Sequence, residues 1–497
     1  MRFQNPWYNF IIETQVMDIM RLNSENIKET IDNAKVLLDK EKDISPALKS
    51  VIQLLLVFMQ AMLERLGLSS KNSSKPPSSD PNRKKKSAKD RKSTKKPGGQ
   101  PGRIGSNLKP VSNPDIIEDI KIDKRTIPRG KYTEDGFESR QILDIDVSII
   151  VTEYRAQVLV DESGKRYVAA FPQNVKRPIQ YGSTVKSESV YMSQYQLIPY
   201  ARINDYFINH ANINISQGSI YNFNLEAYKA LESFEEICKS KLIESSRVNA
   251  DETGININGK RVWLHTACND LWTHFFPHVN RGKIAMDEIG ILPKFKGVLC
   301  HDHWKSYYKY QCEHSLCNAH HLRELEWSSA EDNQKWANQM QEFLVRLNNK
   351  VQKSNGKLSE KQQKYYLNQY NAILLSADIE CPSPDVMKRI KSKDKPRKSK
   401  SRNLLERLIN YKYDVLRFMT RVDVPFTNNQ GENDLRMTKV QQKISGCFRS
   451  EEGARIFCRI RGFLITCRKH GVNEGDALKD LFDGKLPDFV DQQDHGE

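Results

Sequence analysis

The sequence has no cysteine before Cys238, although the chain is 497 residues long and contains nine cysteines. An odd number of cysteines at irregular spacing argues against a disulfide framework and favours a reducing compartment. A long apolar run is also missing, because residues 51–63 include two glutamines and are too few to span a bilayer. The first twenty residues mix polar and apolar side chains, without a signal-peptide pattern. We therefore expect a cytoplasmic protein with no membrane partner.

Acidic side chains are scarce in one segment of an otherwise mixed chain. Residues 71–109 contain thirteen Lys and Arg against two Asp, a local net charge of +11 within a total of +16. The same segment is rich in Ser, Pro and Gly, which predicts a basic flexible linker over 71–110. Concentrated positive charge is typical of a protein that binds a polyanion such as DNA, with a merely solvated linker as the alternative.

The residues before and after this linker predict a multidomain α+β protein. Residues 1–70 form an N-terminal helical region in which we expect a helix over 25–67. A heptad seam within it predicts a coiled coil, with a helix packed on its own domain as the alternative. The seam consists of Ile44, Leu48, Val51, Leu55, Phe58 and Met62. Residues 111–180 predict a small β module, with apolar and polar residues alternating over 141–154.

Helical patterns follow, and then a set of strands. Residues 181–243 predict helices that resemble a helix-turn-helix, although an ordinary helical hairpin would fit equally. Residues 244–319 predict three strands, a helix and two further strands, with a tight turn at Asn258-Gly259. This order is that of a ribonuclease H-like α/β core. Residues 320–425 predict a helical insertion, since they are too many for a loop, and 426–497 return to the core.

Three acidic residues occupy positions that suit metal-dependent chemistry. Asp251 lies on the first predicted strand, Asp302 ends the fourth, and Glu432 lies on a helix after the insertion. Carboxylate oxygens suit Mg²⁺, and two ions about 4 Å apart can activate an attacking oxygen and stabilise a leaving one. We expect Asp251 to bridge two ions and each other acid to complete one of them. For any one acid, a solvated surface position is the alternative.

Cysteine and histidine side chains occur near these acids. Cys317 and His320, with Cys312 and His314 nearby, invite a zinc interpretation, but their spacing matches no standard closed site. We expect Cys317 and His320 to support the active site without zinc. His301 and His303 flank Asp302 on the opposite face of the strand, where they would support or pack rather than bind metal. Trp304 could stack on an unpaired base, with packing as the alternative.

Basic side chains near the motifs and in the linker are candidates for contact with DNA phosphates. They are Arg323, Arg436, Lys439, Lys443, Arg449, Lys84, Lys85 and Lys86.

Several segments of the chain resemble the DDE transposases of the insertion sequence 66 family. The resemblance runs from Ser73-Ser-Lys-Pro-Pro-Ser-Ser-Asp80 to Gly446-Cys-Phe-Arg-Ser. Its strongest segments are Asp251-Glu-Thr, Arg281-Gly-Lys, Ile289-Gly-Ile-Leu-Pro, His301-Asp-His-Trp, Cys317-Asn-Ala-His-His-Leu-Arg-Glu-Leu325 and Asn428-Asn-Gln-Gly-Glu-Asn-Asp-Leu-Arg436.

The resemblance implies a function and a set of partners. Asp251, Asp302 and Glu432 would be the catalytic triad, with two Mg²⁺ ions for which Mn²⁺ can substitute. The reaction would cut transposon terminal repeats in double-stranded DNA and join the 3′-hydroxyl ends to target DNA. A homo-oligomer would assemble on the paired ends, with small companion proteins of the same element as further partners.

One departure and two alternatives accompany the resemblance. Family members usually carry a cysteine-paired zinc module after the Gly98-Gly-Gln-Pro-Gly102 segment, and this chain has no cysteine there. We therefore expect no zinc in the β module. A transposase-derived, non-catalytic DNA-binding protein is the first alternative, against which the intact triad argues. A stand-alone structure-selective nuclease is the second, and dependence on terminal repeats would separate it from a transposase.

Overall fold

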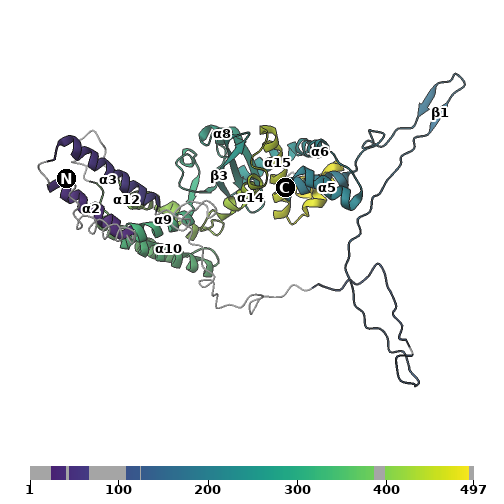
Figure 1. Cartoon of the computed structure of the whole chain (residues 1–497), viewed down its shortest axis with the longest axis horizontal. Coiled ribbons are helices and arrows are strands. Elements are labelled where there is room, and N and C mark those ends of the chain that lie inside the picture. The colour runs from purple at the N-terminus through teal and green to yellow at the C-terminus, as the bar shows by residue number, and fades with distance from the viewer. Residues whose placement is uncertain (1–23, 41–43, 67–107, 124, 385–397, 492–497) are drawn as a thin grey trace, which may run out of the picture. The chain divides into compact units, whose positions relative to one another are not determined.

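The computed structural model describes residues 24–40, 44–66, 108–123, 125–384 and 398–491 (Figure 1). The chain is a mixed α+β protein, about 53% helical, as the coarse fold prediction required. It divides into two compact units, one made of 1–83, 181–200 and 218–497, the other of 84–180 and 201–217. Among the described helices, none combines the length and the apolar character needed to cross a membrane.

The N-terminal region contains two helices, α2 (Ser24–Lys40) and α3 (Pro46–Leu66). The prediction of one continuous helix over 25–67 is wrong, because a second helix begins at Pro46. Proline is favoured in the first turn of a helix. Ile31, Leu38 and Leu56 are buried where α2 and α3 pack together. The seam positions within α3, from Leu48 to Met62, each keep about half or more of their surface exposed. The coiled coil through this seam stays a prediction.

The second unit has little regular structure where the β module was expected. Strand β1 (Val158–Val160) pairs antiparallel with β2 (Arg166–Val168), and Val158 lies opposite Val168. Over 108–123 and 125–180, the described residues form no other strand, so the alternation at 141–154 does not produce one. All residues of both strands are exposed. A two-stranded ribbon with no buried face is only marginally stable by itself.

Helices follow from residue 183 onward. They are α4 (Ser183–Val190), the π-helical turn η2 (Tyr191–Tyr195), α5 (Tyr200–Ala211), α6 (Gln217–Ala230) and α7 (Glu232–Glu244). The helical prediction over 181–243 is confirmed, while a helix-turn-helix role for α5 and α6 stays a prediction.

Five strands form one mixed sheet in the order β5-β4-β3-β6-β7. They are β3 (Arg247–Ile257), β4 (Lys260–Cys268), β5 (Thr273–His278), β6 (Val298–His301) and β7 (Glu313–Leu316). The first three strands are antiparallel, whereas β6 runs parallel to β3 and β7 parallel to β6. Asn258 and Gly259 form the predicted turn between β3 and β4, both with positive φ. The five predicted strands are confirmed to within a few residues at their ends.

Helices cover both faces of this sheet. On one face Ile255, Leu264 and Phe275 pack against α14 (Asn429–Ser445) and α15 (Glu451–Lys469). On the other face α8 (Lys283–Ile289) approaches Ala250 and His265, and its Met286 lines a small cavity with them. Because successive strand residues point to opposite faces, neighbouring residues of β3 belong to different environments. The chain continues after α15 with α16 (Glu474–Phe482) and α17 (Asp488–Asp491).

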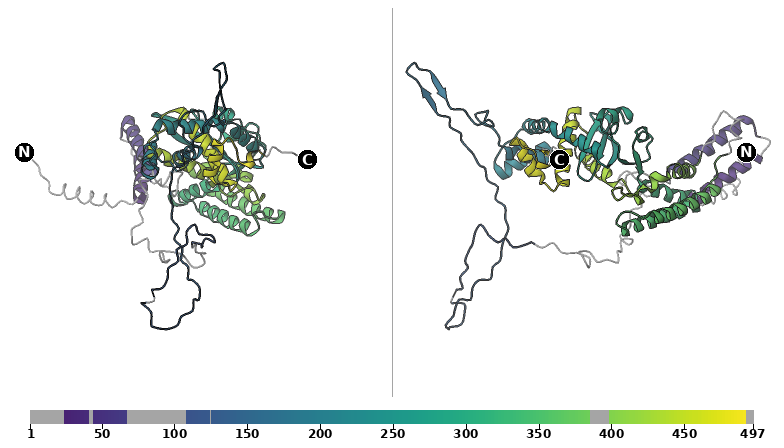
Figure 2. Two further views of the ribbon diagram at one scale, coloured as in Figure 1. Left: turned by 90° about the vertical axis from the view of Figure 1, so that its right-hand side faces the viewer. Right: turned by 180° about the vertical axis from the view of Figure 1, so that it is seen from behind.

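Between β7 and α14 the chain forms helices, as the predicted insertion over 320–425 requires. They are α9 (Asn318–Glu331), α10 (Lys335–Lys353), α11 (Glu360–Glu380), α12 (Lys400–Asn410), α13 (Lys412–Leu416) and the 3₁₀ turn η5 (Arg417–Met419). Trp336 and Tyr370 are completely buried in their shared core. Val298 and Leu316 of the sheet belong to the same cluster, so the helices pack against β6 and β7. Figure 2 shows the insertion helices in green from two further sides.

Gly297, just before β6, is the tightest glycine of the sheet. A Cβ atom there would lie 2.5 Å from the carbonyl oxygen of Ser246 and 2.7 Å from that of Ser245. We expect Gly297→Ala to lower the free energy of unfolding by about 1–3 kcal/mol, because backbone atoms cannot move aside freely. Urea denaturation would measure this. Gly182→Ala is the control, since no atom lies within 4 Å of its Cβ position, and an equal loss in both variants would contradict the explanation.

Candidate active site

Asp251 lies in the middle of β3, the central strand of the sheet, on the face that α14 covers. A Cβ atom added to Gly431 of α14 would lie 3.4 Å from the Asp251 Cβ, so helix and strand are in close contact here. Burial raises the pKa of the Asp251 carboxyl well above its usual range, and the nearby carboxylates of Glu252, Asp302 and Glu432 raise it further. The three acids selected from the sequence therefore interact electrostatically, although they come from separate segments.

Asp302 follows directly after β6, which pairs with β3. The last pair of this parallel ladder is Asn249 with Cys300, and two further steps along both strands lead to Asp251 and Asp302. The Asp302 Oδ1 accepts a hydrogen bond from the backbone N–H of Trp304 at 2.9 Å. Burial raises the pKa of Asp302, while that hydrogen bond and the Arg281 guanidinium act in the opposite direction. The register of the sheet therefore places Asp251 and Asp302 at nearly the same level of two neighbouring strands.

Glu432 is positioned by Asn428, the residue that precedes α14. The Asn428 Nδ2 donates to the Ala250 carbonyl at 2.9 Å, and its Oδ1 accepts from the Asn249 Nδ2 at 2.7 Å. Its backbone N–H donates to the Cys317 Sγ at 3.1 Å. These bonds fix the first turn of α14 against β3. The Glu432 Oε1 is buried there without a hydrogen-bond partner in the structure.

Glu252, the residue after Asp251, points to the other face of the sheet, where it forms a buried ion pair. Its side chain is completely buried, and the Arg281 Nε donates to its Oε1 at 2.8 Å. The Tyr307 hydroxyl donates to its Oε2. Burial raises the pKa of Glu252, as does Asp302, and Tyr307 and Arg281 oppose the rise. Sequence reasoning did not select Glu252, Arg281, Tyr307 or Asn428, although three of them lie in the quoted family-like segments.

Arg281 is also held by a stack of planar side chains. Its guanidinium carbon lies 4.7 Å from the ring centre of Trp263 and 4.4 Å from that of Trp304. Arg261 lies over the same Trp263 ring at 4.5 Å. Cation–π contacts of this kind stabilise a guanidinium in one orientation. Trp304 therefore packs on Arg281, and contact of its ring with an unpaired base stays a prediction.

Cys317 and His320 lie beside Glu432. Cys317 precedes α9, is buried, and lies one helical turn from His320. The His320 Nδ1 is 3.9 Å from the Glu432 Oε1, and the candidate ligand atoms of all three residues lie within 4.8 Å of one another. In the part of the chain that the structure describes, Asp251, Asp302 and Glu432 do not form a set that compact.

Of the remaining histidines near Asp302, His303 contacts the helical insertion, whereas His301 packs against His314 of β7. The ring nitrogens His301 Nε2 and His314 Nδ1 are 3.0 Å apart, so one ring donates a hydrogen bond to the other. The His303 ring contacts Tyr411 with ring centres 4.5 Å apart. Cys312 and His314 are not part of the group that contains Cys317, His320 and Glu432. His303 thus contacts the insertion, and His301 contacts the neighbouring strand β7.

The predicted DNA contacts fall into three groups. Arg436, Lys439, Lys443 and Arg449 are exposed on α14 or just after it, and the Lys439 Nζ donates to the Gly254 carbonyl. Arg323 is half-buried on α9, with its Nε donating to the Ala319 carbonyl at 3.2 Å. Lys84, Lys85 and Lys86 lie outside the described residues.

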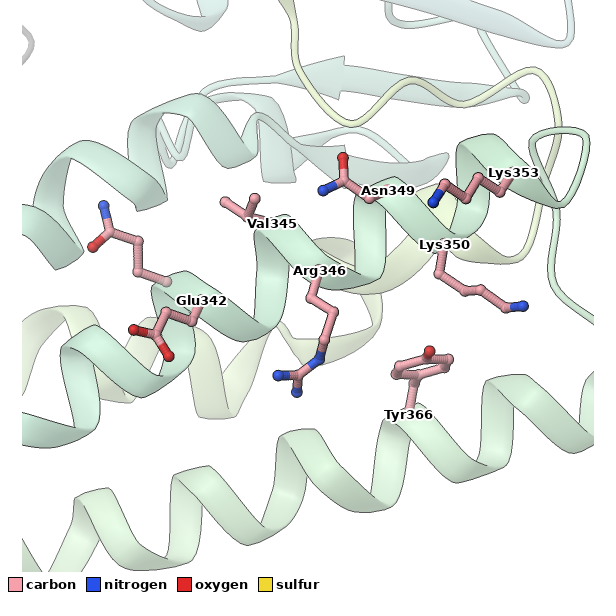
Figure 3. Close-up of a pocket in the computed structure, with 8 residues that line it drawn as sticks. Glu342, Val345, Arg346, Asn349, Lys350, Lys353 and Tyr366 are labelled. Atoms are coloured by element: carbon pink, nitrogen blue, oxygen red, sulfur yellow. The ribbon is translucent and has the colours of Figure 1, made fainter.

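A separate groove lies between α10 and α11 of the insertion. It is lined by Glu342, Arg346, Lys350 and Tyr366, among others (Figure 3). None of the site residues selected from the sequence lines this groove. Asp251, Asp302 and Glu432 therefore remain the candidate active site.

Comparison with known families identifies the chain. A family model described as the transposase IS66 family matches residues 178–456. The chain belongs to this family. The matched stretch of the IS66-family chain contains Asp251, Asp302 and Glu432. A second model, a family of unknown function (DUF6444), matches residues 20–109.

One curated relative of this IS66-family transposase is the uncharacterized protein y4jO of Sinorhizobium fredii. It is 37% identical over 77 residues, which make up 16% of this chain and 24% of that protein. The chain thus spans about a quarter of the length of this relative.

The ion pair between Glu252 and Arg281 yields a stability prediction for this IS66-family chain. Arg281→Ala removes the countercharge and both guanidinium donors from the buried Glu252 carboxylate, and we expect a loss of about 2–4 kcal/mol in the free energy of unfolding. Adding Glu252→Gln should recover at least half of that loss, because the uncompensated charge is removed. Urea denaturation of the single and double variants would measure both effects.

Arg261→Ala is the matched control for this experiment. Arg261 contacts the same Trp263 ring but forms no salt bridge with any acid among the described residues. We expect it to cost about 1 kcal/mol or less. Equal losses for Arg261→Ala and Arg281→Ala would mean that stacking, not the buried charge, dominates.

Proposed function

We propose that this chain is a transposase that cuts transposon ends and joins the 3′-hydroxyl ends to target DNA by two-metal-ion chemistry. The observation that carries the proposal is the placement of the three acids. Asp251 lies on β3, Asp302 directly follows the neighbouring strand β6, and Glu432 lies on α14, whose first turn contacts β3 at Asp251. Membership of the transposase IS66 family supports a function of this type.

The sheet supports a ribonuclease H-like interpretation of the core. Its order is β5-β4-β3-β6-β7, with an antiparallel meander followed by parallel β6 and β7. Asp251 lies on the central strand, and Asp302 follows the strand beside it. The helical insertion between β7 and α14 agrees with a core interrupted before the Glu432 helix.

The donor set suits Mg²⁺ or Mn²⁺. Asp251 is buried against three other carboxylates, and the Glu432 Oε1 is buried without a partner, so added positive charge would relieve both groups. In the proposed site Asp251, Asp302 and Glu432 would hold the two ions. Bound Mg²⁺ would activate the attacking oxygen and stabilise the leaving oxygen. Arg281 holds Glu252 in place on the opposite face, and Asn428 keeps Glu432 against β3.

DNA binding would involve the exposed basic side chains of α14. Arg436 and Lys443 form no salt bridge with any acid in the described residues, so both remain available for phosphate. Exposed seam positions on α3 would support a homo-oligomer on paired ends. Small companion proteins of the same element are part of the proposal as partners.

Removal of one acid is the direct test of the chemistry. In Mg²⁺ with labelled DNA carrying the terminal repeats, we expect Asp302→Asn and Glu432→Gln to reduce end cleavage at least about 100-fold while DNA binding is retained. Glu451→Gln is the control, because that acid is exposed at the start of α15 and pairs with Arg455. Equal cleavage by all proteins would reject the triad.

The same assay separates the alternatives. Binding of the repeats without cleavage by the wild type, even with the companion proteins added, would favour a non-catalytic DNA-binding protein. Cleavage that ignores the repeats would favour a structure-selective nuclease.

Salt dependence tests the proposed phosphate contacts. Arg436→Ala and Lys443→Ala should each reduce the slope of log affinity against log salt concentration by about one, because each removes one neutralised phosphate. Lys479→Ala is a suitable control, since Lys479 pairs with Asp483 on α16. An unchanged slope in either α14 variant would exclude that residue.

A further inference from the structure

Glu432 has a second set of neighbours whose chemistry differs from that of the carboxylates. On one side lie the acids of the proposed reaction. On the other lie the Cys317 Sγ and the His320 ring, with ligand atoms of all three residues within 4.8 Å of one another. Sulfur, imidazole nitrogen and carboxylate oxygen form a donor set that suits Zn²⁺ and similar transition metals, not Mg²⁺.

Each member of this trio is available for a metal ion. The His320 Nδ1 and Glu432 Oε1 are both buried without a hydrogen-bond partner, although they lie only 3.9 Å apart. Neutral imidazole is the form that binds metals. The Cys317 Sγ receives the Asn428 backbone N–H, a bond that also stabilises a thiolate.

The geometry points to a transition-metal site formed by Cys317, His320 and Glu432. Tetrahedral zinc with these ligands needs donor atoms about 3.3–3.8 Å apart. The His320–Glu432 separation of 3.9 Å is close to this, and small side-chain rotations would close the remaining gaps. Three protein ligands leave one position open, as in exchangeable or catalytic zinc sites.

The site has a consequence for the reaction. An ion held here would withdraw Glu432 from the Mg²⁺ site, so the two metals would compete for one carboxylate. This consequence rests on the proposed function, whereas the site itself does not. The sequence indicated only two of the three ligands, because Glu432 lies more than a hundred residues after Cys317 and His320.

Cobalt binding tests the site without DNA or catalysis. Metal-free full-length protein is titrated with Co²⁺, and the absorption band of a thiolate–cobalt bond is followed together with the affinity. We expect one such site, displaced by Zn²⁺. Cys317→Ser should remove the sulfur band and weaken Co²⁺ binding at least about 10-fold. Cys312→Ser, the nearest half-buried cysteine outside the trio, should change neither.

Two further variants keep the test decisive. Glu432→Gln should weaken Co²⁺ binding at least about 10-fold, even if Cys317→Ser proves unstable in a thermal melt, whereas Asp302→Asn should leave it unchanged. An absent sulfur band in the wild type, or equal Co²⁺ affinity in wild type and Glu432→Gln, would overturn the proposal.

The effect of Zn²⁺ on the reaction is measured separately. We expect stoichiometric Zn²⁺ to inhibit Mg²⁺-dependent end cleavage. A cobalt site in a protein that does not cleave would refute the proposed function and leave the metal site standing. Cleavage by a protein that shows no cobalt site would support the proposed function and refute the metal site.

Discussion

The candidate active site depends on the hydrogen bonds of Asn428. Its side chain bonds to Asn249 and Ala250 of the central strand, and its backbone N–H bonds to Cys317. Three segments that are far apart in the sequence therefore meet at one buried amide. Because Asn428 precedes the first turn of α14, the same bonds determine where Glu432 lies. These bonds add to the apolar packing of α14 on the same face of the sheet.

Alternation along β3 separates two kinds of carboxylate. Asp251 points toward α14, where burial and the neighbouring carboxylates raise the pKa of its carboxyl. Glu252 points the other way and is neutralised by Arg281, which is itself stacked between two tryptophans. The Asp251 carboxyl, which lies near other acids, and the Glu252 carboxylate, which is paired with Arg281, thus occupy adjacent positions on one strand. Unrelieved carboxylates of this kind are common where a protein reserves its charge for a bound cation.

The strands of the sheet and the helices of the insertion could be predicted because their signals are local. Alternating or continuous apolar residues identified β3 to β7, and the Asn258-Gly259 turn identified the first hairpin. The same reasoning failed at 141–154, where alternation occurs without any surface to cover it. It also merged α2 and α3, since an apolar periodicity continues across a short break that Pro46 marks.

The sequence by itself determined the identity of the three acids and the elements that carry them, because each acid lies within a short local pattern. Only the tertiary structure decided their surroundings. It assigned Arg281 and Tyr307 to Glu252, Asn428 to the central strand, and Cys317 with His320 to Glu432. These partners come from distant segments, and no local pattern encodes which of them will meet. Contacts of that kind follow from the strand register and from the packing of α9 and α14 against the sheet.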